Sequence, residues 1–185
     1  MANQTDKEPA SSKSAGSQTK QKTGARASRR STRAAAKPED AIKLLKSDHN
    51  EVKGWFDDFE KTDDEAKKEK LARDICRALT VHTQIEEEIF YPAAREVEVD
   101  EDLLDEANVE HASAKQLIAQ IESMGPSDPM FDATVTVLGE YVKHHIEEEE
   151  GELFPECKDS AMNLKALGQE LANRKAELMK TSKAA

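Results

Sequence analysis

The sequence predicts an all-α protein: an up-down-up-down four-helix bundle, followed by an additional C-terminal helix and preceded by a disordered N-terminal arm. The first observation is composition, because 7 Gly, 6 Pro and few aromatic residues among 185, with abundant Ala, Glu, Lys and Leu, are typical of helical proteins. The second is that apolar residues after Pro38 recur at spacings of three and four. The third is that the connections between consecutive helices are short, which favours antiparallel neighbours.

The N-terminal arm comprises residues 1–38. It contains no Leu, Ile, Val or Phe and has a charge balance of +7, whereas the rest of the chain has a balance of −18. Such a segment buries too little apolar surface to offset the entropy lost on ordering. Two roles stay open for residues 1–37: contact with nucleic acid or an acidic partner, or simple solubilisation. An organellar transit peptide is disfavoured by Asp6 and Glu8 and by the missing apolar face.

The first helical hairpin follows this arm, and each of its helices carries one histidine on its apolar stripe. The stripe of the first helix is Ile42, Leu45, His49, Val52, Phe56 and Phe59. The stripe of the second helix is Leu71, Ile75, Ala78, His82, Ile85 and Ile89. The second helix is expected to stop at Pro92, because proline removes a backbone donor and clashes with the preceding turn.

The second hairpin repeats this arrangement. The stripe of the third helix is Leu104, Ala107, His111, Ala114, Ile118 and Ile121, and the helix ends at the Gly125-Pro126 breaker. The stripe of the fourth helix is Phe131, Val135, Leu138, Val142, His145 and Glu149, and the helix is expected to stop at Pro155. We assign residues 39–157 to the bundle. Residues 158–185 are expected to form a C-terminal helix, roughly Ser160 to Lys180, that packs on the bundle.

The histidines of the two hairpins are similarly spaced along the chain. His49 and His82 are 33 residues apart, and His111 and His145 are 34 residues apart. A repeated pattern, HxxxE-x5-P, occurs as His82, Glu86 and Pro92 and again as His145, Glu149 and Pro155. Residues four apart lie on the same helix face, so each histidine and its glutamate point in the same direction.

These residues predict a metal site. Two ionised carboxylates, Glu86 and Glu149, would be turned toward a bundle core, which is strongly unfavourable unless a cation lies between them. Apart from Lys115, no lysine or arginine lies on a stripe near this level, so a metal is the simpler explanation. The predicted ligands are His49, His82, Glu86, His111, His145 and Glu149. Four imidazoles and two carboxylates are more ligands than one tetrahedral zinc takes. They suit iron or manganese in a dinuclear site, and iron is favoured.

Together with the FYP and LFP sequences that end the second and fourth helices, these residues resemble the hemerythrin-like HHE cation-binding domain family. The resemblance covers about residues 40–156. It implies a non-haem centre of two iron ions joined by an oxo or hydroxo bridge, with the histidines as terminal ligands and the two glutamates as bridges. It also implies a small ligand such as O2, NO or peroxide.

One position departs from the oxygen-carrying hemerythrins, which have a second histidine one turn after the first on the third helix. In this chain that position is Lys115. One fewer imidazole leaves a coordination position for water or an added ligand, which disfavours reversible oxygen carriage and favours a sensing or redox-active centre.

Several neighbours of the ligands are assigned to other roles. His144 is the alternative to His145, but it is rotated by about 100° from it and matches neither the stripe nor the repeat. Glu87 and Glu150 could tune the site from outside the ligand set, and the remaining glutamates of the two acidic runs are expected to be solvated. The aromatic residues are expected to pack the core and the hairpin ends; they are Trp55, Phe56, Phe59, Phe90, Tyr91 and Phe154.

The leading functional hypothesis is a di-iron protein that binds or senses oxygen, nitric oxide or peroxide. The alternatives are a peroxide-decomposing or ferroxidase-like enzyme on the same site, and a nucleic-acid-associated helical protein acting through its basic arm. No apolar run is long enough to span a bilayer and no hydrophobic signal region opens the chain, so we expect a cytoplasmic protein without membrane contact. Cys76 and Cys157 have no metal-site spacing and are expected to be reduced thiols.

Overall fold

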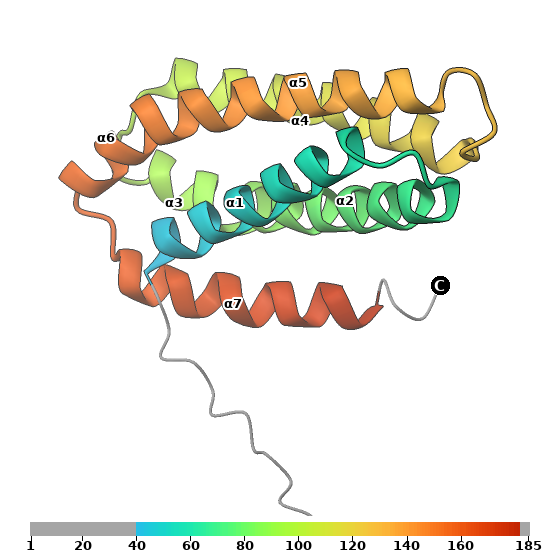
Figure 1. The fold of residues 1–185 in the computed structure, drawn as a ribbon. Helices are drawn as coiled ribbons and strands as arrows, with labels where there is room; N and C mark the ends of the chain where they lie inside the picture. Colours follow the sequence, from blue (N-terminus) through green and yellow to red (C-terminus); the bar gives the residue numbers. More distant parts are fainter. Residues whose placement is uncertain (1–39, 182–185) are drawn as a thin grey trace, which may run out of the picture. The chain divides into compact units, whose positions relative to one another are not determined.

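The computed structural model describes residues 40–181, and the predicted disordered arm, residues 1–38, lies outside the described residues. Within 40–181 the chain is helical and contains no strand, so the predicted all-α class is confirmed. The four bundle helices are α1 (Ala41–Glu60), α2 (Glu65–Ile85), α4 (Glu101–Ser123) and α5 (Phe131–Glu148). Helices α1 and α4 each contact both α2 and α5, so the four pack around a common core (Figure 1).

Three of these helices begin at an aspartate that caps the first turn. The side chains of Asp40, Asp64 and Asp100 each accept a hydrogen bond, 2.9 Å long, from a backbone N–H two or three residues later. This bond satisfies one of the backbone donors that the first turn of a helix leaves unpaired. The caps therefore fix where α1, α2 and α4 start, and with them the level at which each histidine enters the core.

The two prolines do not end their helices, contrary to the prediction. Helix α2 continues through a π-helical turn, η1 (Glu86–Phe90), into α3 (Tyr91–Arg95), and α5 continues through η2 (Glu149–Leu153) into α6 (Phe154–Asp159). Proline in a regular helix clashes with the carbonyl four residues earlier, and a turn that holds one additional residue relieves this conflict. The repeated HxxxE-x5-P sequence thus encodes a π turn that starts at the glutamate.

These π turns reorient the residues that follow them. The backbone N–H of Tyr91 bonds to the carbonyl of Glu86, and that of Phe154 bonds to the carbonyl of Glu149, a separation of five residues in both cases. In a regular α-helix a residue five positions later is rotated by about 140° from the first. Across the π turn it lies one turn further along the same side, so Tyr91 and Phe154 point into the bundle with the two glutamates.

Helix α7 (Leu164–Thr181) packs on the outside of the bundle along α1 and α2 (Figure 1). It starts four residues later than predicted, after Asn163, whose side chain accepts a hydrogen bond from the backbone N–H of Ala166. Leu171 of α7 is fully buried, and Arg174 forms an ion pair with Glu88. The helix therefore covers the first hairpin.

The apolar core forms two clusters at different levels of the bundle. One includes Phe56, Phe59, Leu79, Leu138 and Val142, and it fills the end where α1 meets α2 and α4 meets α5. The other surrounds the π turns and includes the buried residues Leu45, Ile85, Phe90, Tyr91, Leu104, Phe154 and Leu171. The buried polar residues include four histidines and two glutamates that belong to neither cluster. The sequence places the histidines between these levels, one on each of the four bundle helices, and the glutamates at the start of the two π turns.

Candidate metal centre

Four histidines, one from each bundle helix, meet in this buried polar layer. The Nε2 atoms of His49 and His82 are 3.1 Å apart, and those of His111 and His145 are 3.2 Å apart. All four residues are at most 7% exposed. The imidazoles are therefore arranged as two pairs, one from each hairpin.

Two buried glutamates connect the histidine pairs. Glu86 lies with Oε1 3.2 Å from Nε2 of His82 and with Oε2 3.4 Å from Nε2 of His111. Glu149 lies with Oε2 3.4 Å from Nε2 of His49 and 3.6 Å from Nε2 of His145. Each glutamate consequently faces one histidine from each hairpin, and the six residues selected from the sequence lie together in space.

Each histidine also has a carboxylate beside its other ring nitrogen, Nδ1. Three of these contacts are hydrogen bonds: His49 to Glu150 at 3.0 Å, His111 to Glu87 at 3.0 Å and His145 to Glu110 at 2.7 Å. The fourth is an ion-pair contact, with Nδ1 of His82 3.5 Å from Asp48. An ionised carboxylate can only accept, so each hydrogen bond keeps the proton on Nδ1 and leaves the Nε2 lone pair facing the centre.

These four outer carboxylates follow a simple rule in the sequence. Each directly precedes or follows one of the six central residues, but it contacts a histidine on a different helix. Glu87 and Glu150 were expected to tune the site and do contact it. Asp48 and Glu110 were missed, although an acidic residue immediately before His49 and before His111 was a visible signal.

Two aromatic residues occupy equivalent places over the two halves of the centre. The ring of Tyr91 stacks on His111 with centroids 5.5 Å apart, and the ring of Phe154 stacks on His49 with centroids 5.8 Å apart. Only Tyr91 has a hydroxyl, which donates a 2.9 Å hydrogen bond to Oε1 of Glu149 and lies 3.3 Å from Nε2 of His111. The assignment of Tyr91 to packing alone was therefore incomplete, because its polar atom reaches the centre.

The electrostatics of the centre show that its two carboxylates do not ionise independently. Burial raises the pKa of Glu86, and the neighbouring charge of Glu149 raises it further. Burial also acts to raise the pKa of Glu149, but the charges of His145, His49 and His82 outweigh it and lower the value to about 2. For His82, burial alone would lower the pKa, yet Glu86 and Asp48 raise it to about 10. Without a cation, the centre therefore retains protons that a metal ion would displace.

The donor set fits metal ions. One group, His49, His82, Glu86 and Glu149, and a second, Glu86, His111 and His145, each bring their donor atoms within 4.8 Å of one another. Both oxygens of Glu86 and Oε2 of Glu149 are buried and have no hydrogen-bond partner, which is costly unless a cation satisfies them. Two nitrogens about 2.1 Å from one ion, at roughly a right angle, are about 3 Å apart, as in each histidine pair.

Comparison with known proteins agrees with this arrangement. The sequence model of the hemerythrin HHE cation-binding domain family matches residues 40–157. The chain belongs to this family. The resemblance inferred from the sequence is confirmed, and the two buried groups of histidines and glutamates are residues of this HHE domain that could hold metal cations.

Two similar proteins place the domain in a wider context. A DNA nickase from Nostoc sp. (strain PCC 7120) is 31% identical over 117 residues, which are 63% of this chain and 33% of the nickase. The chain thus spans about a third of the length of that relative. The crystal structure of an HHE cation-binding domain-containing protein from Mycobacterium kansasii has a TM-score of 0.66 at 22% identity, covering 77% of this chain and 89% of that one. At this identity the likeness shows a shared fold.

Two positions of this HHE domain lie outside the centre. Lys115, where oxygen-carrying hemerythrins have a further histidine, is 45% exposed in its side chain and donates to both oxygens of Glu87 at 2.6 Å. It therefore acts on His111 through Glu87, and its positive charge adds to the burial that lowers the pKa of His111. His144 is 63% exposed in its side chain and faces Glu148 and Glu110 on the surface, whereas His145 points inward.

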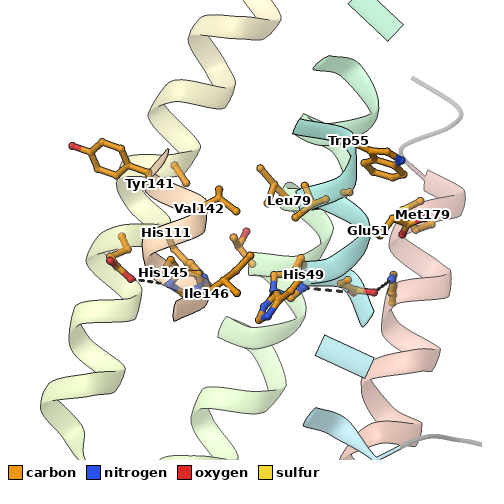
Figure 2. A pocket seen from close by; sticks show the side chains of 18 residues that line it. His49, Glu51, Trp55, Leu79, His111, Tyr141, Val142, His145, Ile146 and Met179 are labelled. Carbon is orange, nitrogen blue, oxygen red and sulfur yellow. Dashed lines mark hydrogen bonds and ion pairs between the residues drawn. The ribbon is translucent and has the colours of Figure 1, made fainter. Parts of the chain in front are cut away.

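A cavity of about 130 Å³ adjoins the centre of this HHE domain. The four histidines line one end of it, and Val52, Leu79, Ala114, Val142 and Ile146 form its walls. Figure 2 shows His49, His111 and His145 at the lower end, with Leu79 and Val142 above them and Trp55 and Tyr141 on opposite sides. The side of the centre that faces the cavity is thus bordered by apolar side chains rather than by further ligands.

Among the described residues, no helix is both long enough and apolar enough to cross a membrane.

Proposed function

We propose that this chain is a non-haem di-iron protein whose carboxylate-bridged centre binds or senses oxygen, nitric oxide or peroxide. The observation that supports this most directly is Glu86, a fully buried carboxylate whose two oxygens face histidines of different hairpins and have no hydrogen-bond partner. A carboxylate in this position suits two cations, one held by each histidine pair. Mixed nitrogen and oxygen ligands favour iron or manganese over a structural zinc.

In this proposal each residue has a defined task. His49 and His82 would hold one ion, His111 and His145 would hold the other, and Glu86 and Glu149 would contribute carboxylate ligands to both. When bound, the two iron ions would supply the binding and redox chemistry for the small ligand. The outer carboxylates keep the imidazoles oriented, and the hydroxyl of Tyr91 holds Glu149 in position. The apolar walls of the cavity exclude bulk water from the open side.

Metal quantification with optical spectroscopy tests the proposal. Protein produced in iron-replete medium should contain about two iron ions per chain and absorb in the near ultraviolet as an oxo-bridged centre does. Adding nitric oxide or peroxide should change this spectrum. Less than one iron per chain, or a spectrum indifferent to both ligands, would contradict the proposal.

A peroxide-decomposing or ferroxidase-like enzyme is the second candidate. It is supported by Lys115, which is directed outward so that no imidazole fills the corresponding position, and by the cavity beside the histidines. Turnover of peroxide by the iron-loaded protein that is lost in Glu149→Ala would support an enzyme. An iron-loaded protein that binds peroxide without consuming it would remove this candidate.

Nucleic-acid contact through residues 1–37 is a further proposal. It is supported by the basic charge balance of this segment and by the name of the DNA nickase relative, of which the chain covers 33%. Binding to duplex DNA should weaken steeply with salt and should disappear when residues 1–37 are deleted. Binding that is absent or independent of salt would exclude it.

A cytoplasmic location also remains part of the proposal, and the two free, buried cysteines support it.

A further inference from the structure

The cavity beside the centre is larger than the proposed small ligands require. Its volume is about 130 Å³. A water molecule occupies about 30 Å³ of liquid, and O2, NO and hydrogen peroxide are similarly small. An apolar protein cavity of about 150 Å³ accommodates benzene. The space between the histidines and the surface is therefore close in size to a six-carbon ring.

The walls of this cavity favour a hydrocarbon group. Val52, Val142 and Ile146 are at most 5% exposed, and Leu79 and Ala114 are also buried. These side chains offer no hydrogen bonds, so a string of ordered waters would lack partners along most of the space. The lining also includes the imidazoles, the buried Thr83, whose hydroxyl already donates to the carbonyl of Thr80, and the more exposed Glu51 and Lys175.

The charges around the cavity disfavour an anion. The residues that line it include three carboxylates, Asp48, Glu51 and Glu110. The lining cation apart from the histidines is Lys175, which is already paired with Asp48. A ligand with a carboxylate would bring a further negative charge next to these groups with no free lysine to receive it. The lining is thus complementary to a neutral molecule.

We infer that this cavity binds a small neutral organic molecule, with a hydrocarbon part about the size of a six-carbon ring and an oxygen-bearing head directed toward the histidines. The head group rests on the proposed function, because an alcohol or alkyl hydroperoxide oxygen would be the part that meets the metal centre. The hydrocarbon part rests on the cavity alone. The occupant contacts Val52, Leu79 and Val142 on its sides and Trp55 near the opening.

Trp55 provides a direct readout because it is the single tryptophan of the chain and lines the cavity. The full-length protein, as purified, is titrated with cyclohexanol and with cyclohexanecarboxylate, which share the ring and differ in charge. Cyclohexanol should shift the Trp55 emission saturably, and cyclohexanecarboxylate should bind at least about tenfold more weakly. No saturable shift with cyclohexanol, or equal binding of the two, overturns the inference.

A filling variant locates the site. Ala114→Leu adds bulk to the cavity wall without changing a central residue, and it should weaken cyclohexanol binding at least about tenfold. Ala119→Leu, on the exposed face of the same helix, is the matched control and should bind like the unmodified chain. If Ala114→Leu does not fold, Ala78→Leu fills the same cavity from α2. Unchanged affinity in the folded filling variant overturns the inference.

The iron-loaded protein separates this inference from the proposed function. Ala114→Leu should retain its iron, because no central residue is changed, while losing cyclohexanol binding. A protein that takes up iron and nitric oxide but never binds cyclohexanol overturns the cavity inference alone. A protein that binds cyclohexanol in the cavity yet contains no iron supports the hydrocarbon site and overturns the di-iron proposal.

Discussion

Each hairpin supplies one histidine pair, and the two halves of the centre around these pairs differ in few respects. Each half has two histidines with Nε2 atoms 3.1 or 3.2 Å apart, an outer carboxylate for each imidazole and an aromatic ring stacked on one imidazole. The second half differs in having the Tyr91 hydroxyl where the first has the bare ring of Phe154. The first half differs in being covered by α7, whose Lys175 pairs with Asp48.

Some features of the centre are repeated in both halves, and others occur in one half alone. The features that both halves share set the positions of donor atoms, and they follow from helix phase, the π turn and neighbouring acidic residues. The features that differ are the Tyr91 hydroxyl, which makes the second half more polar, and α7, which covers the first half. Differences between the two ions in a loaded centre should therefore originate from Tyr91 and α7.

The largest effect is expected from removing a carboxylate that both halves share. Glu149→Ala should remove most metal from both halves, because Glu149 contacts His49 of one hairpin and His145 of the other. Metal content per chain after purification measures this loss. Glu147→Ala, on the exposed side of the same acidic run, should keep its metal. Two ions per chain in Glu149→Ala would show that the halves are independent.

The next effect concerns pH. In the folded, metal-free centre the pKa of His82 is raised to about 10, so this imidazole is protonated at neutral pH, and the pKa of Glu86 is also raised. A metal ion must displace the protons held by its ligands, so its apparent affinity should rise with pH, by roughly tenfold per pH unit for each proton released. Manganese titrations between about pH 6 and pH 8, in two buffers of different ionisation enthalpy, measure both the affinity and the protons. An affinity independent of pH would exclude protonated ligands in the metal-free state.

A smaller effect is expected from making the two aromatic positions alike. Tyr91→Phe removes the hydrogen bond to the buried Glu149 and should lower the free energy of unfolding of the metal-free protein by about 1.5–3 kcal/mol. The loaded protein should keep its metal but show a shifted near-ultraviolet spectrum. Tyr141→Phe is the matched control, because Tyr141 is 51% exposed and should change neither property. Equal stability and equal spectra for the two variants would show that the Tyr91 hydroxyl does not distinguish the two halves.

The smallest effect distinguishes two of the lysines that pair with outer carboxylates, Lys175 and Lys115. Lys175 lies on α7 beside Asp48, and Lys115 lies beside Glu87 with its side chain 45% exposed. Exposed ion pairs contribute about 0–1 kcal/mol, so Lys115→Ala should change stability little. Lys175→Ala should cost somewhat more, since it also loosens α7 from α1. Urea denaturation of both variants measures the difference, and a larger effect of Lys115→Ala would contradict it.

Much of the fold and of the centre could be predicted from the sequence because both depend on helical phase. The apolar stripes identify which side of each helix is buried, and the spacing of His82 from Glu86 and of His145 from Glu149 directs each pair inward. The exclusion of His144 follows from the same phase, and its exposed position agrees with it. These inferences need only the regular geometry of an α-helix.

The remaining features depend on departures from that geometry or on contacts between helices. The prolines were interpreted as helix ends because a regular helix does not accommodate them, whereas the chain inserts a π turn. Tyr91 was assigned to packing with the other aromatic residues, and in a regular helix it would be turned away from Glu86. The repeat did contain a signal, since Tyr91 and Phe154 both follow their histidine by nine residues. The pairing of Asp48 with His82 depends on how α1 and α2 pack, which one-helix patterns do not describe.

The π turns also determine which changes of chain length the domain can tolerate. Removing one residue between Glu86 and Tyr91 would place Tyr91 four positions after Glu86, which is the same face of an ordinary α-helix. The segment that follows would keep its orientation, whereas the clash of Pro92 with the carbonyl four residues earlier would return. The corresponding deletion after Glu149 should act in the same way. A one-residue deletion here should therefore lower stability through the proline while the side chains of the centre still face inward.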